Sequence, residues 1–169
     1  QTVALIAAIF NNNNQFTEAV DVTETYRLTD TLNVDVNRQN AKAYCMLKYY
    51  KTSINRYEAL KAMGDRSFTT LYYLGVSQYA DNWPYGARDN LLEAHKKNPM
   101  DVNVLYYLAK ACARSSWKEE GIAYMNKAFD MVVPTDSMMI RLYDGLLECY
   151  KFHTKADPYE KIEVMKEAY

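Results

Sequence analysis

The chain has 169 residues, of which 49% are apolar and 24% charged, a composition typical of one soluble globular domain. Its formal net charge of −1 excludes a global attraction to nucleic acid or to an anionic membrane. The longest apolar run, residues 3–10, is far shorter than the roughly 20 residues that span a bilayer and lacks a basic leader, so neither a membrane helix nor a signal peptide is expected.

Helical periodicity and short turns predict five consecutive pairs of helices. In chain order the pairs cover residues 2–10 and 16–28, 35–50 and 53–63, 68–79 and 84–97, 102–113 and 118–131, and 136–153 and 157–169. The four asparagines that join the first pair are expected to form a turn, a place that asparagine readily occupies.

Turn and cap residues mark several boundaries of these helices. Gly64 is expected to end its helix, because glycine readily adopts the left-handed conformation found at helix C-termini. Pro84 suits the first turn of a helix, and Asp101 is a predicted N-cap. Ser116 and Glu119 have the spacing of a capping box, which predicts a reciprocal cap at the start of the helix over 118–131.

The third pair carries small and apolar residues at fixed offsets. They are Leu71, Leu74, Gly75, Ala87, Leu91, Ala94 and Pro99. This pattern resembles the tetratricopeptide repeat (TPR), which has a Leu-Gly pair on its first helix, a small and a larger apolar residue on its second, and a closing proline. Gln78 and Leu71 depart from the aromatic residue and the tryptophan that are usual in the family.

Small residues recur when the chain is shifted by about 34 residues, the period of that family. The copies of Gly75 are Ala7, Ala41 and Ala109, and those of Ala87 are Ala19, Ser53 and Gly121. Two antiparallel helices approach closely only where side chains are small, so these positions are the expected contacts within each pair. The resemblance implies an all-α, right-handed α-solenoid, a single domain over 1–169 with repeats at about 1–33, 34–67, 68–101, 102–135 and 136–169.

An end repeat of such a solenoid lacks one neighbour, and stacking on neighbours supplies much of the stability. The apolar face of the first helix, formed by Val3, Leu5, Ile6 and Ile9, is therefore expected to be covered by something.

Ligands of this family usually lie on the concave surface, which the first helices line. The positions that the resemblance places there are Arg38, Lys42, Tyr72, Tyr73, Val76, Tyr106, Tyr107, Lys110, Arg114, Arg141 and Asp144. The two tyrosine pairs are one repeat apart, so they are expected to form a ladder. Tyrosine and arginine are enriched at binding hot spots, which favours a protein-interaction scaffold that binds an extended peptide or partner helix of acidic character.

Other readings of the same residues stay open. The tyrosines could instead pack between helices, or the aromatic row could bind a carbohydrate or another small ligand. A nucleic-acid partner is disfavoured by the sequence pI of about 6.2. A clamp for a C-terminal carboxylate, known in one subclass of the family, is not expected, because only Arg141 matches among its five positions.

No catalytic or cofactor motif stands out. The sequence has no Gly-rich phosphate loop, no HExxH pair and no cysteines with metal-ligand spacing, so no cofactor, no metal and no enzymatic activity are expected. Cys45, Cys112 and Cys149 are expected to be small apolar residues, buried or half-buried, and their spacing implies no disulfide pairing. His95 and His153 are expected to lie solvated on the surface. Because the sequence begins at Gln1, it is either processed or an excerpt, and it indicates neither a compartment nor an oligomeric state.

Overall fold

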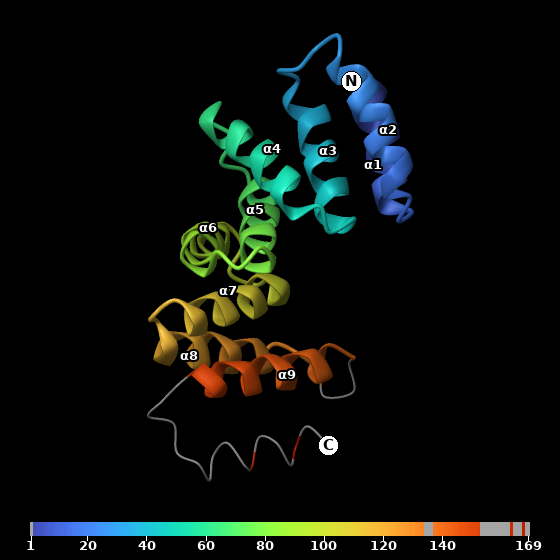
Figure 1. Cartoon of the computed structure of the whole chain (residues 1–169). Helices are drawn as coiled ribbons and strands as arrows, with labels where there is room; N and C mark the ends of the chain where they lie inside the picture. The colour runs from blue at the N-terminus through green and yellow to red at the C-terminus, as the bar shows by residue number, and fades with distance from the viewer. Residues whose placement is uncertain (1, 134–136, 153–162, 164–166, 168–169) are drawn as a thin grey trace. The chain divides into compact units, whose positions relative to one another are not determined.

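The computed structural model describes residues 2–133 and 137–152, together with residues 163 and 167, and this part of the chain is all-α (Figure 1). The helices are α1 (Thr2–Asn12), α2 (Phe16–Arg27), α3 (Val34–Met46), α4 (Tyr50–Ala62), α5 (Phe68–Ala80), α6 (Pro84–Lys97), α7 (Val102–Arg114), α8 (Lys118–Phe129) and α9 (Ser137–Phe152). The predicted helices of the first four pairs are thus confirmed, as is the first helix of the fifth pair, α9. His153 and the predicted helix over 157–169 lie outside the described residues, apart from 163 and 167.

Side-chain N-caps precede the first helix of three helix pairs, at a regular spacing along the chain. Asn33, Ser67 and Asp101 precede α3, α5 and α7, and each accepts a hydrogen bond from the backbone N–H three residues later. Such caps satisfy one of the amide groups that a helix N-terminus leaves without an intrahelical partner. The predicted cap at Asp101 is confirmed, and the other two lie one and two repeat periods before it.

Left-handed residues mark the turns inside the pairs at the same spacing. Asn14, Lys48, Asn82 and Ser116 have φ of 59°, 67°, 64° and 71°, and each follows the one before by one repeat period. The turn at Lys48 ends α3 at Met46, so the predicted continuation of that helix to residue 50 is wrong. The predicted capping box is also wrong, because Ser116 itself occupies the left-handed turn and the N-cap of α8 is Trp117, whose side chain makes no capping bond.

Gly64 ends α4 as predicted. With φ of 91° it follows the C-cap Met63, its N–H donates to the Lys61 carbonyl at 3.0 Å, and the Asp65 N–H donates to the Leu60 carbonyl at 3.0 Å. This pair of bonds is a Schellman motif, which satisfies carbonyls that the helix end would otherwise leave unpaired.

The chain divides into two compact units, Gln1–Asn82 and Trp83–Tyr169. In the first unit α3 packs against α1, α2, α4 and α5. In the second unit α7 packs against α6, α8 and α9, and α8 also packs against α9. The prediction that residues 1–169 form one continuous superhelical domain of five repeats stays a prediction.

The close contacts within the helix pairs fall at the small residues that the periodicity singles out. In the first unit the Ser53 hydroxyl donates to the Ala41 carbonyl across α3 and α4, at 2.9 Å. In the second unit a Cβ added at Gly121 would lie 2.7 Å from the Ala109 carbonyl oxygen and 3.0 Å from the Ala113 nitrogen. The helices of a pair therefore approach closely at these sites, through a small side chain in the first unit and through the backbone itself in the second.

The stacking of the first two hairpins is polar where later hairpins use leucine. Asn40 of α3 is fully buried and donates to Glu24 of α2 at 3.0 Å, and Arg56 of α4 reaches the same carboxylate at 3.2 Å. The residues one and two repeat periods after Asn40 are Leu74 and Leu108, both fully buried. Burial alone raises the pKa of Glu24, but these hydrogen bonds outweigh burial and hold the pKa below its ordinary value.

His95 is buried, so its predicted place on the solvated surface is wrong. Its ring packs edge-on against Tyr124 of α8, with centroids 5.7 Å apart, because Leu91, Ala94 and His95 share the inward face of α6. Burial, and then the charge of Lys127, lower the pKa of His95. The three cysteines are free and buried, as predicted.

Two glycines of the second unit test how tightly the helices pack. Gly121→Ala is expected to lower the free energy of unfolding by about 1–3 kcal/mol, because the added methyl would meet rigid backbone. Gly145→Ala is expected to cost less, since the added methyl would meet side chains and not backbone: the terminal methyl of Met125, which can move, and the ring edge of Tyr106 at 2.8 Å. Urea unfolding of the two variants measures the difference, and an equal or larger loss for Gly145→Ala would contradict this account.

Candidate functional site

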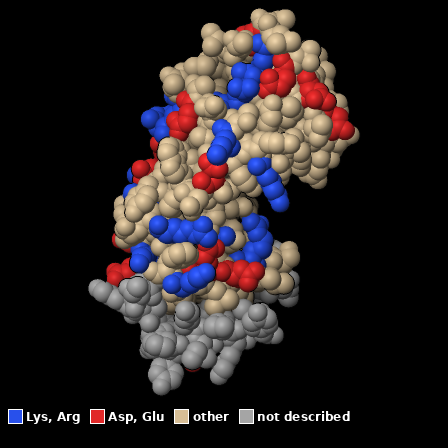
Figure 2. Space-filling view, in the orientation of Figure 1, with Lys and Arg blue, Asp and Glu red and all other residues tan. Residues whose placement is uncertain are grey.

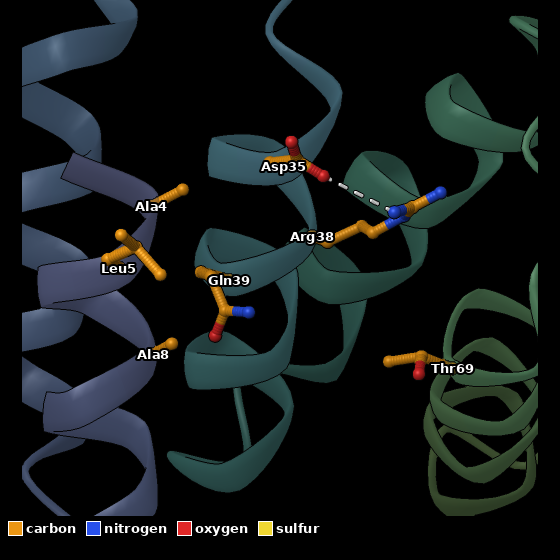
Figure 3. A pocket seen from close by; sticks show the side chains of 7 residues that line it. All are labelled: Ala4, Leu5, Ala8, Asp35, Arg38, Gln39 and Thr69. Carbon is orange, nitrogen blue, oxygen red and sulfur yellow. Dashed lines mark hydrogen bonds and ion pairs between the residues drawn. The ribbon is translucent and has the colours of Figure 1, made fainter. Parts of the chain in front are cut away.

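A pocket of about 520 Å³ opens along the first helices of the first unit (Figure 3). Its lining residues come from α1, α3 and α5: Ala4, Leu5, Ala8, Asp35, Arg38, Gln39 and Thr69. Figure 3 shows Ala4, Leu5 and Ala8 on α1 facing Gln39 on α3, with Thr69 on α5 at the far side. The pocket therefore has one apolar wall and a polar floor, the combination that is common in ligand sites.

The floor of the pocket is held in place from α1. Asn11 is buried, and its amide nitrogen donates to both the backbone carbonyl of Gln39 at 3.0 Å and the Gln39 side-chain oxygen at 2.9 Å. These bonds fix the orientation of the Gln39 amide. In Figure 3 its nitrogen points away from α1, toward the side where Thr69 lies.

Arg38 is the one predicted binding residue that lines this pocket, and its charge is already paired. Its guanidinium donates to both carboxylate oxygens of Asp65, at 2.7 and 2.8 Å, and contacts Asp35 at 3.4 Å. Asp65 is buried and also accepts from the Thr70 hydroxyl at 2.6 Å and the Ser67 N–H at 3.1 Å. The Arg38 guanidinium, together with these hydrogen bonds, holds the pKa of Asp65 far below its ordinary value.

This ion pair joins α3 to the start of α5, so its removal tests the floor of the pocket. Asp65→Asn is expected to lower the free energy of unfolding by about 3 kcal/mol at neutral pH, because it leaves Arg38 without its buried counter-ion. The folded-state pKa of Asp65 is depressed, so its contribution is present above about pH 4 and is lost as pH falls below that value.

Urea unfolding at a series of pH values measures this contribution. The stability gap between wild type and Asp65→Asn should narrow as the solution is acidified. Asp21→Asn, at an exposed position on α2, is the matched control and should change stability little at any pH. A gap that stays constant down to acid pH would show that the Asp65 charge is not what stabilises the fold.

The other predicted residues of the first unit lie beside the pocket rather than in it. Tyr73 stacks on Tyr57 of α4, with centroids 6.4 Å apart, and carries the Lys42 ammonium 5.5 Å from its ring centre. Tyr72 stacks on Phe68 at 5.9 Å. Lys42, Tyr72, Tyr73 and Val76 are all half-buried. Part of each tyrosine ring is thus used in packing within the first unit.

In the second unit a glutamate of α9 contacts two of the predicted basic residues. Glu148 pairs with Lys110 of α7 at 3.1 Å through one oxygen and with Arg114 through the other. Burial alone lowers the pKa of Lys110, but the hydrogen bond to Tyr106 and the charge of Glu148 outweigh burial and raise it. On the face drawn in Figure 2, basic side chains are likewise mixed with acidic ones and form no continuous cationic stripe.

Tyr106 belongs to the core of the second unit more than to its surface. It is 8% exposed, packs edge-on against the half-buried Tyr107, and has Lys110 and Arg141 at 4.7 and 4.8 Å from its ring centre. Arg141 is exposed and lines a smaller pocket, of about 350 Å³, with residues that include Val102 and Met138. Asp144 is exposed on the same helix. The ladder of tyrosine pairs stays a prediction, because the two pairs belong to different units.

Glu148→Gln tests whether this carboxylate holds α7 and α9 together. The variant is expected to lose about 1–2 kcal/mol of unfolding free energy, since a neutral amide cannot compensate the charges of two cations that are partly removed from water. Urea unfolding gives the loss, and Glu120→Gln at an exposed position on α8 is the control. Similar, small effects of the two changes would contradict a stabilising role for Glu148.

Several pocket residues were not predicted from the sequence, although the repeat could have located them. Ala4, Leu5 and Ala8 lie one repeat period before Arg38, Gln39 and Lys42, and Thr69 lies one period after Asp35. Each of them therefore occupies the same repeat position as another pocket residue or as a predicted binding residue. The prediction selected charged and aromatic side chains, whereas alanine contributes to a pocket by leaving space in it.

Within the part of the chain that the structure describes, no group of three or more His, Cys, Asp or Glu side chains is placed to hold a metal ion. A search of the same residues finds no helix with the length and apolar character needed to cross a membrane.

Solved structures of low sequence identity share this fold. YrrB, described as a TPR protein with an unusual peptide-binding site, has a TM-score of 0.80 at 15% identity, covering 98% of this chain and 82% of its own. MamA AMB-1 has a TM-score of 0.82 at 17% identity, covering 99% and 95%. MamA from Desulfovibrio magneticus RS-1 has a TM-score of 0.68 at 16% identity, covering 80% and 76%.

By sequence, no family model and no curated protein matches the chain. The structural likenesses nevertheless confirm the predicted fold class: the chain has the all-α solenoid fold of the tetratricopeptide-repeat proteins.

Proposed function

We propose that the chain is a protein-interaction scaffold and that the pocket lined by α1, α3 and α5 binds an extended peptide or a partner helix. The observation that carries this proposal is the pocket itself, which runs over three successive first helices and has a volume of about 520 Å³. Its apolar wall offers contact area, and the fixed amide of Gln39 offers a directional polar group.

The structural likeness to YrrB supports the same class of ligand, since that protein is described as having a peptide-binding site. Identity to YrrB is only 15%, so the likeness concerns the fold and leaves the choice of ligand to the residues of this chain.

The carbohydrate alternative has less support from the described residues. A sugar ring stacks on the open face of an aromatic side chain, whereas Tyr73 and Tyr72 are stacked on Tyr57 and Phe68 in nearly parallel pairs, with interplanar angles of 7° and 4°. We therefore place the ligand against α1 and α3 and not on the tyrosines.

For the second unit we retain an acidic partner segment as the proposed ligand of Arg114 and Arg141. Both side chains are exposed. Glu148 contacts Arg114, so an acidic ligand would extend an existing ion pair there and would not fill an empty site.

The pocket can be tested by filling it. A random-peptide phage-display library, selected on the purified chain, supplies probe peptides, whose affinities are then measured by fluorescence anisotropy. Thr69→Trp places a large side chain at an exposed position of the pocket lining and is expected to weaken these peptides at least tenfold, about 1.4 kcal/mol.

Thr17→Trp is the matched control, because Thr17 is an exposed threonine on α2 outside the pocket lining. Circular dichroism confirms that both variants retain their helices. If every selected peptide binds Thr69→Trp as tightly as wild type, the pocket is not the peptide site.

A further inference from the structure

We propose that the pocket of the first unit selects a peptide segment in which a basic side chain lies next to an apolar one, and that Asp35 is the residue that selects the positive charge. This inference rests on the proposed function of the same pocket. It concerns the chemistry of the ligand. For this pocket it replaces the acidic ligand that Arg38 and Lys42 led us to expect with a basic one.

The charged residues at the pocket favour a basic ligand. Among the residues that the structure describes, Arg38 is the only cation that lines the pocket, and two carboxylates contact it, those of Asp35 and Asp65. The Asp65 carboxylate is only 4% exposed and binds Arg38 through both of its oxygens. The charge of Arg38 is thus neutralised by the buried Asp65, and the exposed charge that a ligand would meet in the pocket is that of Asp35.

Asp35 is exposed and only weakly paired. Its side chain is 69% exposed, and its one contact with Arg38, at 3.4 Å between residues one helical turn apart, is of a kind that contributes little stability. Figure 3 shows this carboxylate on α3, at the end of the pocket nearest the start of that helix. A lysine, arginine or N-terminal ammonium of a ligand can therefore pair with Asp35 without breaking a strong interaction.

Lys42 does not change this balance. It follows Arg38 by one turn of α3, but it is absent from the pocket lining and its ammonium lies over the Tyr73 ring. A carboxylate entering the pocket would meet Asp35 directly and would have to compete with Asp65 for Arg38, which makes an acidic segment the poorer fit.

The apolar wall supplies the second half of the specificity. Ala4 and Ala8 leave space on α1, and Leu5 between them is 65% exposed, so an aliphatic or aromatic side chain can bury itself there. The Gln39 amide oxygen is taken by Asn11, whereas its amide nitrogen donates no hydrogen bond within the described residues. That nitrogen is placed to donate to a backbone carbonyl of the bound segment.

The test uses peptides selected from the same random-peptide display library. We expect those whose binding is blocked by Thr69→Trp to be enriched in lysine or arginine beside an apolar residue. Replacing the basic residue of one such peptide by glutamine should weaken binding to the unchanged protein about tenfold, and glutamate should weaken it further. Because this comparison leaves the protein unaltered, no question of folding arises.

Variants of the protein then assign the charge to Asp35. Asp35→Asn should weaken the basic peptide about tenfold and leave its glutamine version unaffected, and Asp35→Lys should shift the preference toward the glutamate version. Asp21→Asn and Asp21→Lys, at an exposed aspartate of α2 outside the pocket lining, should change neither affinity.

Two results would overturn this inference in different ways. Peptides that are blocked by Thr69→Trp but are acidic or neutral, and insensitive to Asp35, would refute the charge selection and leave the peptide site intact. A complete absence of peptides blocked by Thr69→Trp would remove the proposed function and this inference together. A dimer in sedimentation that Thr69→Trp dissociates would assign the pocket to a second copy of the chain and would also refute it.

Discussion

Close approach of paired helices at small residues is the constraint on which the rest of this structure depends. Ser53 bonds directly to the backbone of Ala41, and Gly121 leaves no room for a methyl group against Ala109. Because the helices of a pair lie this near each other, neighbouring first helices such as α1, α3 and α5 can line one continuous pocket. A larger side chain at the contact between Ser53 and Ala41 would push α4 away from α3, the helix that carries Asp35, Arg38 and Gln39 of the pocket.

Internal carboxylates govern the electrostatics of both units. Asp65 forms an ion pair with Arg38, and Glu148 forms ion pairs with Lys110 and Arg114. In each case the acidic residue belongs to a different element from the basic one. A cation that is paired inside the protein positions helices, and it attracts ligands less than its charge alone would suggest. The exposed charge beside the pocket is then the least paired one, that of Asp35.

The polar seam between the first two hairpins shows that the repeat fold tolerates two kinds of stacking. At this repeat position the first two hairpins are joined by a hydrogen bond from Asn40 to Glu24, whereas the later repeats place the buried Leu74 and Leu108 there. Every buried polar group there needs its partner, because an unpaired one would cost about 1–3 kcal/mol. These hydrogen bonds therefore allow only one packing geometry of α2 against α3. They also fix the position of α3, the helix that carries Asp35, Arg38 and Gln39.

The sequence by itself determined the helix pairs, the period at which they repeat and the small residues at their contacts, since turn, cap and packing preferences act over short stretches of chain. Only the tertiary structure decided the site. Arg38 is neutralised by a carboxylate 27 residues away, and His95 is buried against another helix although two lysines follow it. Such pairings depend on which faces of distant helices meet, and the residue types do not encode that meeting locally.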